Sequence, residues 1–201
     1  LRCERVEVSY FHDPNVLHLA EDFFEETHAA IVPQRANHLG VSIYSPEEFN
    51  AALDNSFLTV IQAPMSIVDY RISDEQLEQA ALTKKLVFAR SVFLQGVLLQ
   101  DLPALPKFLT DITPVLQQLQ SISSETGLNR MEILMQAVLA RPGISGIVVG
   151  AETTGQLGEI ASAFKAQPLS PDLQEQFSAM KSQPLDLIDP RRWPKGWKSK
   201  Q

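Results

Sequence analysis

The sequence is poor in several features that would assign a function directly. It has one cysteine, Cys3, so no internal disulfide can form, and this favours a reducing, cytoplasmic compartment. No run approaches the roughly 18 apolar residues of a membrane span, and no signal peptide is recognisable. Basic residues are in the minority, with 17 Lys and Arg against 24 Asp and Glu, which gives a net charge of −7. We therefore expect neither nucleic acid nor an anionic membrane as a partner.

Motifs of several enzyme classes are missing as well. The first apolar run ends in Phe-His-Asp-Pro-Asn, without the glycine-rich turn that opens a doubly wound dinucleotide fold. A phosphate-binding P-loop, a G-x-S-x-G elbow and paired glycosidase carboxylates are also lacking. No His or Cys cluster has the spacing of metal ligands, so no metal is expected.

Apolar runs of strand length are present, and they do not alternate cleanly with polar residues. Continuous hydrophobicity is typical of parallel strands that are covered on both faces. The expected strands lie near 6–12, 38–43, 58–63, 86–90 and 145–149.

Helix-start signals fall between these runs. Each combines a capping side chain with a glutamate, a glutamine or a proline in the first turn, and the expected caps are Ser45, Ser73, Asn129, Thr153 and Ser170. Two helices, about 111–126 and 129–141, stand between the last two strands. Strand–helix alternation predicts a parallel sheet with right-handed crossovers. We expect an α/β fold, a partial (β/α)8 TIM barrel over residues 1–182, followed by a tail over 183–201.

The C-terminal strand ends of such a barrel carry its active site. They bear hydrogen-bonding groups or closely approachable backbone, and in order they are His12, Ser42, Gln62, Arg90–Ser91 and Gly150–Ala151. This rim suits a polar, nucleotide-like ligand, and the single imidazole could polarise a carbonyl group.

At these same residues the sequence resembles the aldo/keto reductase family. The matching segments run in barrel order, from about residue 4 to about residue 182: SYFHDP (9–14), GVSIYSPEEF (40–49), VIQAPMSIVDYR (60–71), ARSVFLQGVLL (89–99) and GISGIVVGAETTGQLGEI (143–160). They resemble strands four to eight of the family's barrel. The resemblance implies an oxidoreductase that transfers hydride between a nicotinamide cofactor and a carbonyl or alcohol substrate.

The resemblance also assigns roles to single residues. His12 would donate a hydrogen bond to the substrate carbonyl, and Ser42 and Gln62 would hold the nicotinamide carboxamide. Arg90 stands where relatives place a stacking tyrosine; it either contacts the cofactor or pairs with Asp69 or Asp101.

Further assignments concern the cofactor's other end. Ser91, Gln95 and Gly96 would lie along the pyrophosphate, whereas Phe93 is either a cofactor contact or core. The turn into the last barrel helix would bind phosphate, and an acid would lie near the adenine; the residues are Gly150, Ala151, Thr153, Gln156 and Glu159. We expect NADP(H), but AETTGQ (151–156) lacks the basic residue that usually grips the 2′-phosphate, so NAD(H) stays open.

One part of the family's site is not apparent. Its general acid is a tyrosine supported by a lysine and an aspartate, and those elements would precede Leu1. We therefore expect the sequence to start inside the barrel and to be inactive as it stands. The competing interpretation is a non-catalytic half-barrel that dimerises or binds a partner or nucleotide, because a cut sheet exposes edges. An unrelated barrel enzyme for a phosphorylated ligand is a third possibility.

Two segments outside the motifs suggest further contacts. The leucines and prolines of 99–114 predict an apolar wall for a small carbonyl substrate. The basic segment PRRWPKGWKSK (190–200) is either a solvated or docked terminus, which we favour, or a tail that binds a nucleotide or membrane.

Overall fold

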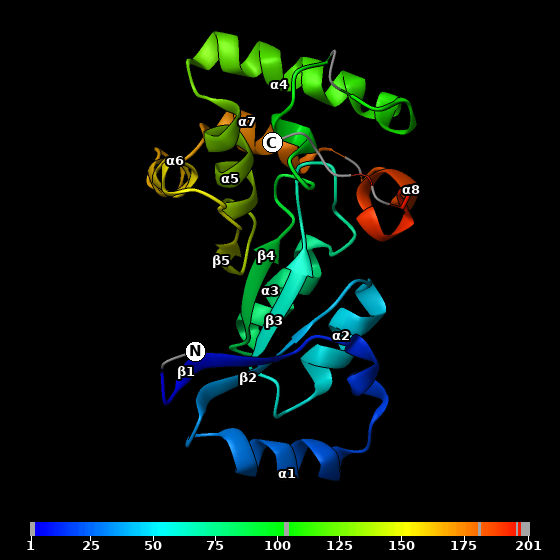
Figure 1. The fold of residues 1–201 in the computed structure, drawn as a ribbon, viewed down its shortest axis with the longest axis vertical. Coiled ribbons are helices and arrows are strands. Elements are labelled where there is room, and N and C mark those ends of the chain that lie inside the picture. The colour runs from blue at the N-terminus through cyan, green and yellow to red at the C-terminus, as the bar shows by residue number, and fades with distance from the viewer. Residues whose placement is uncertain (1–2, 103–104, 181, 196, 198–201) are drawn as a thin grey trace. The chain divides into compact units, whose positions relative to one another are not determined.

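The computed structural model describes residues 3–102, 105–180, 182–195 and 197. Five strands form one sheet whose spatial order is the order of the sequence (Figure 1). The strands are β1 (Val6–Phe11), β2 (Ala36–Ser42), β3 (Val60–Pro64), β4 (Leu86–Arg90) and β5 (Ile144–Val148). The pairs β1–β2, β2–β3 and β3–β4 are parallel. The predicted α/β fold with a parallel sheet is confirmed.

Helices separate the strands and follow the last one. The α-helices are α1 (Glu21–Ile31), α2 (Pro46–Asp54), α3 (Asp74–Leu82), α4 (Thr113–Thr126), α5 (Arg130–Leu139), α6 (Thr154–Phe164), α7 (Pro171–Ser178) and α8 (Leu185–Ile188). Short 3-10 helices are η1 (Pro14–His18), η2 (Val97–Leu99), η4 (Lys107–Ile112) and η5 (Pro190–Arg192). Among the described residues, none of the helices has the length and apolarity to cross a membrane.

The predicted helix starts are observed. Ser45, Ser73, Asn129 and Thr153 each form a complete capping box, in which cap and third helical residue bond each other's backbone N–H. Ser170 caps α7 by accepting from the N–H of Leu173. The helix expected from about 111 begins at Thr113, because η4 occupies the preceding residues.

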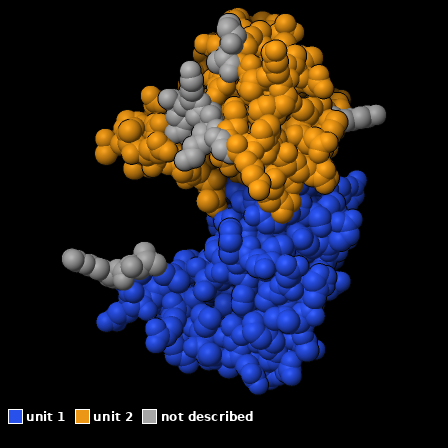
Figure 2. Space-filling model, turned by 45° about the vertical axis from the view of Figure 1, so that its right-hand side comes forward, with its two compact units in different colours: residues 1–64, 71–90, 142–146 blue, residues 65–70, 91–141, 147–201 orange. Residues whose placement is uncertain are grey.

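The chain divides into two compact units, coloured separately in Figure 2. Unit 1 comprises residues 1–64, 71–90 and 142–146, and unit 2 comprises 65–70, 91–141 and 147–201. The described residues beyond 183 belong to unit 2, and the boundary expected at 182/183 stays a prediction.

The sheet of unit 1 has two different faces. One face carries Val41, Ile61 and Val87, which pair in register and are fully buried. Helices α2 and α3 contact β3 and β4, respectively, and bury Phe49 and Leu77 completely. Burial of such a side chain stabilises the fold by about 1.5–3 kcal/mol. This face is therefore the hydrophobic core of unit 1.

The other face of the sheet is less covered. Tyr10 is 36% exposed and Leu86 is 39% exposed, in a row that also holds Gly40 and Val60. Gly40 lets the Tyr10 ring lie flat, since an added Cβ would come within 2.8 Å of the ring and 2.9 Å of the Val60 carbonyl oxygen. The polar strand-end residues extend from this second face.

Unit 2 is a helical layer that includes the basic segment at the end of the sequence. The buried Gln136 of α5 donates to the carbonyl oxygens of Ala163 and Phe164, which ties α5 to the end of α6. Trp193 is only 7% exposed, and its ring lies 5.8 Å from Phe108 and 4.9 Å from Trp197 between centroids. Over its described residues the segment thus docks on the unit; 196 and 198–200 lie outside them.

The charges of that segment are also partly neutralised. Arg191 forms an ion pair with the buried Asp189, and Arg192 forms one with Asp186. These two guanidinium groups therefore have partners inside unit 2.

Candidate functional site

Two of the predicted site residues belong to one row across the sheet of unit 1, and a third follows the end of the neighbouring strand. Ser42 pairs in register with Gln62, and Phe11 pairs with Val41. His12 follows Phe11 directly and lies just beyond the end of β1. Side chains alternate between faces along a strand, and partners in register share a face. Ser42 and Gln62 therefore lie next to one another on the less covered face.

The middle of this row is joined by a hydrogen bond. The hydroxyl of Ser42, which is 2% exposed, donates to Oε1 of the half-buried Gln62 at 3.5 Å. The bond is long, so it holds both side chains weakly. A ligand carrying both a donor and an acceptor, such as a carboxamide, could bond with both residues.

Arg90, at the end of β4, lies against the segment that follows β2. Its guanidinium donates to the carbonyl oxygen of Ile43 at 3.0 Å, and its central carbon lies 4.4 Å from the centroid of the Tyr44 ring. A guanidinium over an aromatic ring is a favourable cation–π arrangement. Asp101, one of its two expected carboxylate partners, forms an ion pair with Arg130 at 3.2 Å. Tyr44 beneath Arg90 was not anticipated from the sequence.

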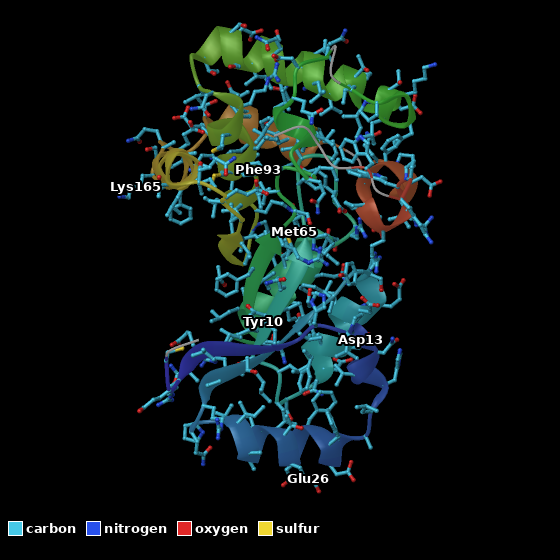
Figure 3. All side chains as sticks on the ribbon, in the orientation of Figure 1. Tyr10, Asp13, Glu26, Met65, Phe93 and Lys165 are labelled. Carbon is cyan, nitrogen blue, oxygen red and sulfur yellow. The ribbon has the colours of Figure 1, made fainter. Side chains whose placement is uncertain are left out.

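A shallow cavity of about 490 Å³ opens at the end of β1. It is lined mainly by apolar and amide side chains around the exposed His12: Tyr10, Phe11, His12, Asp13, Asn15, Val16 and Leu19. Asp13 caps η1 by accepting from the N–H of Asn15 at 3.0 Å, and burial raises the pKa of Tyr10. In Figure 3, Tyr10 and Asp13 mark β1 and the residues past its end, while Glu26 projects from α1 into solvent. Here the imidazole can meet a small ligand.

A larger cavity, of about 730 Å³, lies entirely within unit 2. Its walls are the segment 91–101 and the segment 148–160, with Met131 of α5 between them. Predicted site residues are brought together here: Ser91, Gln95, Gly96, Gly150, Ala151, Gln156 and Glu159. Phe93, labelled in Figure 3, is half-buried and lines this cavity. Core residue and ligand contact are thus compatible roles for Phe93.

The first wall has a strained backbone. Ser91, Leu94 and Gln95 have φ of 62°, 47° and 54°, and Gly96 follows at 82°. A left-handed conformation costs a residue with a side chain roughly 1–2 kcal/mol. The segment is held by Leu94, which is 1% exposed and whose N–H donates to the Ser91 carbonyl oxygen at 2.8 Å. Backbone strain of this kind concentrates at ligand sites.

The second wall is the start of α6. Thr153 accepts from the N–H of Gln156 at 3.2 Å, and the Gln156 side chain accepts from the N–H groups of Glu152 and Thr153 at 2.7 and 3.3 Å. The first-turn N–H groups of Thr154 and Gly155 have no acceptor within the helix. Together with the helix dipole they form a position that suits a phosphate.

Comparisons with known proteins bear on the fold. No protein-family model matches the sequence, and no curated protein matches it. Among solved structures, the holo form of an aldo-keto reductase from Bacillus halodurans is similar with a TM-score of 0.71 and 21% identity; the match covers 94% of this chain and 65% of that protein.

Two further structures agree. A glycerol dehydrogenase from Gluconobacter oxydans matches with a TM-score of 0.70 and 17% identity, over 98% of this chain and 63% of its own. A thermostable aldo-keto reductase solved with the inhibitor epalrestat matches with a TM-score of 0.66 and 18% identity, over 88% and 60%. The chain spans somewhat less than two thirds of these proteins' length. Its fold is that of aldo-keto reductases, and the predicted resemblance is confirmed at this level.

Proposed function

We propose that the chain is a nicotinamide-dependent oxidoreductase of the aldo/keto reductase type, acting on a small carbonyl or alcohol substrate. In this proposal, β1 to β5 correspond to strands four to eight of a (β/α)8 barrel. The observation that carries it is the cavity of unit 2. Motif segments that are about fifty residues apart in the sequence, 91–96 and 150–159, form its opposite walls.

The residues of this cavity fit a dinucleotide. Its volume of about 730 Å³ is in the range of cofactor sites. Gln100 is one of the lining residues, and its Oε1 is buried without a hydrogen-bond partner among the described residues. Gly96, Gly150 and Ala151 have little or no side chain, so a ligand in the cavity can approach their backbone closely. The N–H groups at the start of α6 would bind the phosphates.

The residues of unit 1 would serve the reacting end. A nicotinamide supplies the hydride when bound. Ser42 and Gln62 would hold its carboxamide, and so fix which ring face is presented to the substrate. His12 would donate a hydrogen bond to the substrate carbonyl oxygen, where negative charge grows during reduction. Arg90, already bonded to Ile43, would add a positive charge near the ring.

Binding is the decisive test of this proposal, because none of the three tyrosines stands in the family's proton-donor motif. We expect NADH or NADPH to quench the fluorescence of Trp193 and Trp197 saturably. Gly155→Glu should weaken binding at least about tenfold, since it adds a carboxylate where phosphate would lie. An added side chain there meets only Thr153 Oγ1, at 3.8 Å. A glutamate in the first helical turn also favours the helix, so the variant should fold.

The matched control is Gly158→Glu, on the same helix, where an added Cβ meets nothing within 4 Å. It makes the same chemical change away from the first turn and should bind like the unchanged protein. Absence of binding to both dinucleotides would refute the proposal. If both glutamate variants weaken dinucleotide binding equally, the phosphates do not bind at the start of α6.

One observation favours the competing function, a non-catalytic protein that pairs with another chain. Strands β1 and β5 are the two ends of the strand order, so the described sheet does not close. Unpaired edges tend to recruit a partner. Analytical ultracentrifugation distinguishes the two: a stable dimer that binds no dinucleotide supports this function, whereas a monomer that binds one excludes it.

A further inference from the structure

Strand β1 is an edge strand whose residues are only partly covered. It stands at one end of the strand order and pairs with β2, and no described strand lies on its other side. None of its six residues is buried, whereas four of the five residues of β3, inside the sheet, are buried. The backbone N–H and C=O groups along the outer side of such a strand are a template for a further strand.

The edge of β1 lacks the usual protection against strand addition. Natural edge strands are commonly protected by proline, by lysine or by a bulge. Val6–Phe11 contains neither proline nor lysine, and its only charged residue is Glu7. The Glu7 carboxylate accepts a hydrogen bond from the side-chain amide of Asn37 in β2 at 2.6 Å, so it is held toward β2 and away from the open edge. Its charge therefore does not block that edge.

The two faces of β1 differ in polarity, because side chains alternate between faces along a strand. One face carries Val6, Val8 and Tyr10, and the other carries Glu7, Ser9 and Phe11. Helix α1 packs on the second face, since the rings of Phe23 and Phe24 lie 5.9 and 6.0 Å from the Phe11 ring between centroids. An added strand would extend both faces, with apolar side chains on the first and polar ones on the second.

The surroundings of the second face are acidic. Residues 6–31 contain neither lysine nor arginine, and their acids are Glu7, Asp13, Glu21, Asp22, Glu25 and Glu26. All six are exposed, and Figure 3 shows Glu26 pointing from α1 into solvent. Charges across an interface tend to be complementary, so the acids favour a strand that carries lysine or arginine on this face. A second copy paired through the same edge would bring the same acids and would be repelled.

The cavity of about 490 Å³ at the end of β1 offers a position for an anchoring side chain. All of its lining residues lie between Tyr10 and Leu19, and none of them belongs to β2, so the cavity opens on the side of the free edge. Leu19, in its lining, is 49% exposed. When a strand adds to a sheet edge, backbone hydrogen bonds supply affinity and side-chain pockets supply specificity. The edge and the cavity together provide both.

We propose that the open edge of β1 is a docking site for an extended segment of another protein, which adds to the sheet as a further strand. The segment has apolar side chains on the face that it shares with Val6, Val8 and Tyr10. It has basic side chains on the face that it shares with α1, and one apolar side chain occupies the cavity. The docking site is separate from the unit 2 cavity and does not depend on dinucleotide binding.

Fluorescence anisotropy of a labelled peptide tests the proposal on the full chain. The probe is a synthetic peptide of alternating valine and lysine with blocked ends, long enough to span Val6–Phe11. We expect it to bind saturably, and more weakly as salt screens the charges. Two further peptides carry backbone N-methyl groups on the valines alone or on the lysines alone. Successive N–H groups of a strand point to opposite edges, so one of these peptides should bind at least about tenfold more weakly and the other should bind like the probe.

A matched pair of variants tests the position of the site. Leu19→Lys adds a positive charge in the cavity and should weaken binding of the probe at least about fivefold. Leu82→Lys makes the same change at the end of α3, where Leu82 is 78% exposed and does not line the cavity, and should bind like the unchanged protein.

Four results would overturn the proposal. The first is the absence of saturable binding by the probe. The second is equal binding of the probe and both N-methylated peptides, which would show attraction by charge alone. The third is equal weakening by the two lysine variants. The fourth is a dimer in analytical ultracentrifugation that the probe dissociates, because a second copy would then be the occupant of the edge. A titration with NADH on the same preparation bears only on the proposed function.

Discussion

Gly143 offers a sharp test of how unit 1 is packed. It precedes β5 with φ of +68°, and an added Cβ would lie 2.4 Å from the carbonyl oxygen of Leu77 in α3. Real Cβ atoms essentially never approach closer than 3.0 Å. In Gly143→Ala the left-handed backbone costs roughly 1–2 kcal/mol, and displacement of α3 or β5 adds about 1–3 kcal/mol. We therefore expect a loss of about 2–5 kcal/mol in the free energy of unfolding.

The matched control is Gly127→Ala at the C-cap of α4, where φ is +74° and nothing lies within 4 Å of an added Cβ. Gly127→Ala has the same cost of a left-handed backbone but no clash. The difference between the two variants in free energy of unfolding therefore measures the contact with Leu77. Urea unfolding followed by far-UV circular dichroism reports on both units, and tryptophan fluorescence reports on unit 2, which holds both tryptophans. If Gly143→Ala proves no less stable than Gly127→Ala, the close approach to α3 is refuted.

Two other substitutions probe a buried charge and the strained wall. Lys85 donates to the carbonyl oxygens of Asn55 and Leu58 at 2.6 Å each, and its burial lowers the pKa of the amine. Between that lowered pKa and 10.5 the unfolded chain binds more protons, so stability should rise with pH there. Lys85→Met should be less stable at neutral pH by about 1–3 kcal/mol and should lack this rise. If the urea midpoints of the variant and the unchanged protein change with pH in parallel, this prediction is wrong. Gln95→Gly should raise the free energy of unfolding by about 0.5–1 kcal/mol, because glycine adopts the left-handed backbone freely. If Gln95→Gly has a lower melting temperature than the unchanged protein, the left-handed conformation at Gln95 is refuted.

The helix starts were predictable because their hydrogen bonds are local. A capping box needs only two side chains that are three residues apart, as at Asn129 and Glu132, so the pattern is complete in the sequence. Helix α1 lacks such a signal, since its cap position is Ala20 and forms no side-chain hydrogen bond. It is held by long-range contacts instead: Phe24 is 1% exposed and packs edge-on against Phe11, with ring centroids 6.0 Å apart.

Strand boundaries depended on neighbours in the same way. The second strand, expected from 38, begins at Ala36, because Ala36 pairs with Val6 of β1 and is fully buried. The third strand, expected at 58–63, is shifted to Val60–Pro64 by its pairing with β4, in which Pro64 lies opposite Arg90. Apolar character alone cannot specify a register.

The two cavities differ in how much of them the sequence predicts. The neighbouring positions of Ser42 and Gln62 follow from alternation and from the ends of parallel strands, which are periodic properties. The wall at 91–96 does not, because three residues with side chains adopt positive φ there and only Gly96 carries the usual signal. The orphaned oxygen of Gln100 is a property of packing and has no sequence signature.

This difference has a consequence for the proposed chemistry. In the proposal, residues on the strand ends of unit 1 bind the nicotinamide and polarise the carbonyl, and their positions are fixed by the ladder that links β1 to β3. The phosphate contacts proposed at the start of α6 do not depend on that ladder, and Gly155 is exposed there. Gly155→Glu should therefore weaken dinucleotide binding with little effect on the strand ends of unit 1. A Gly155→Glu variant that unfolded at a much lower temperature than Gly158→Glu would show that this separation is false.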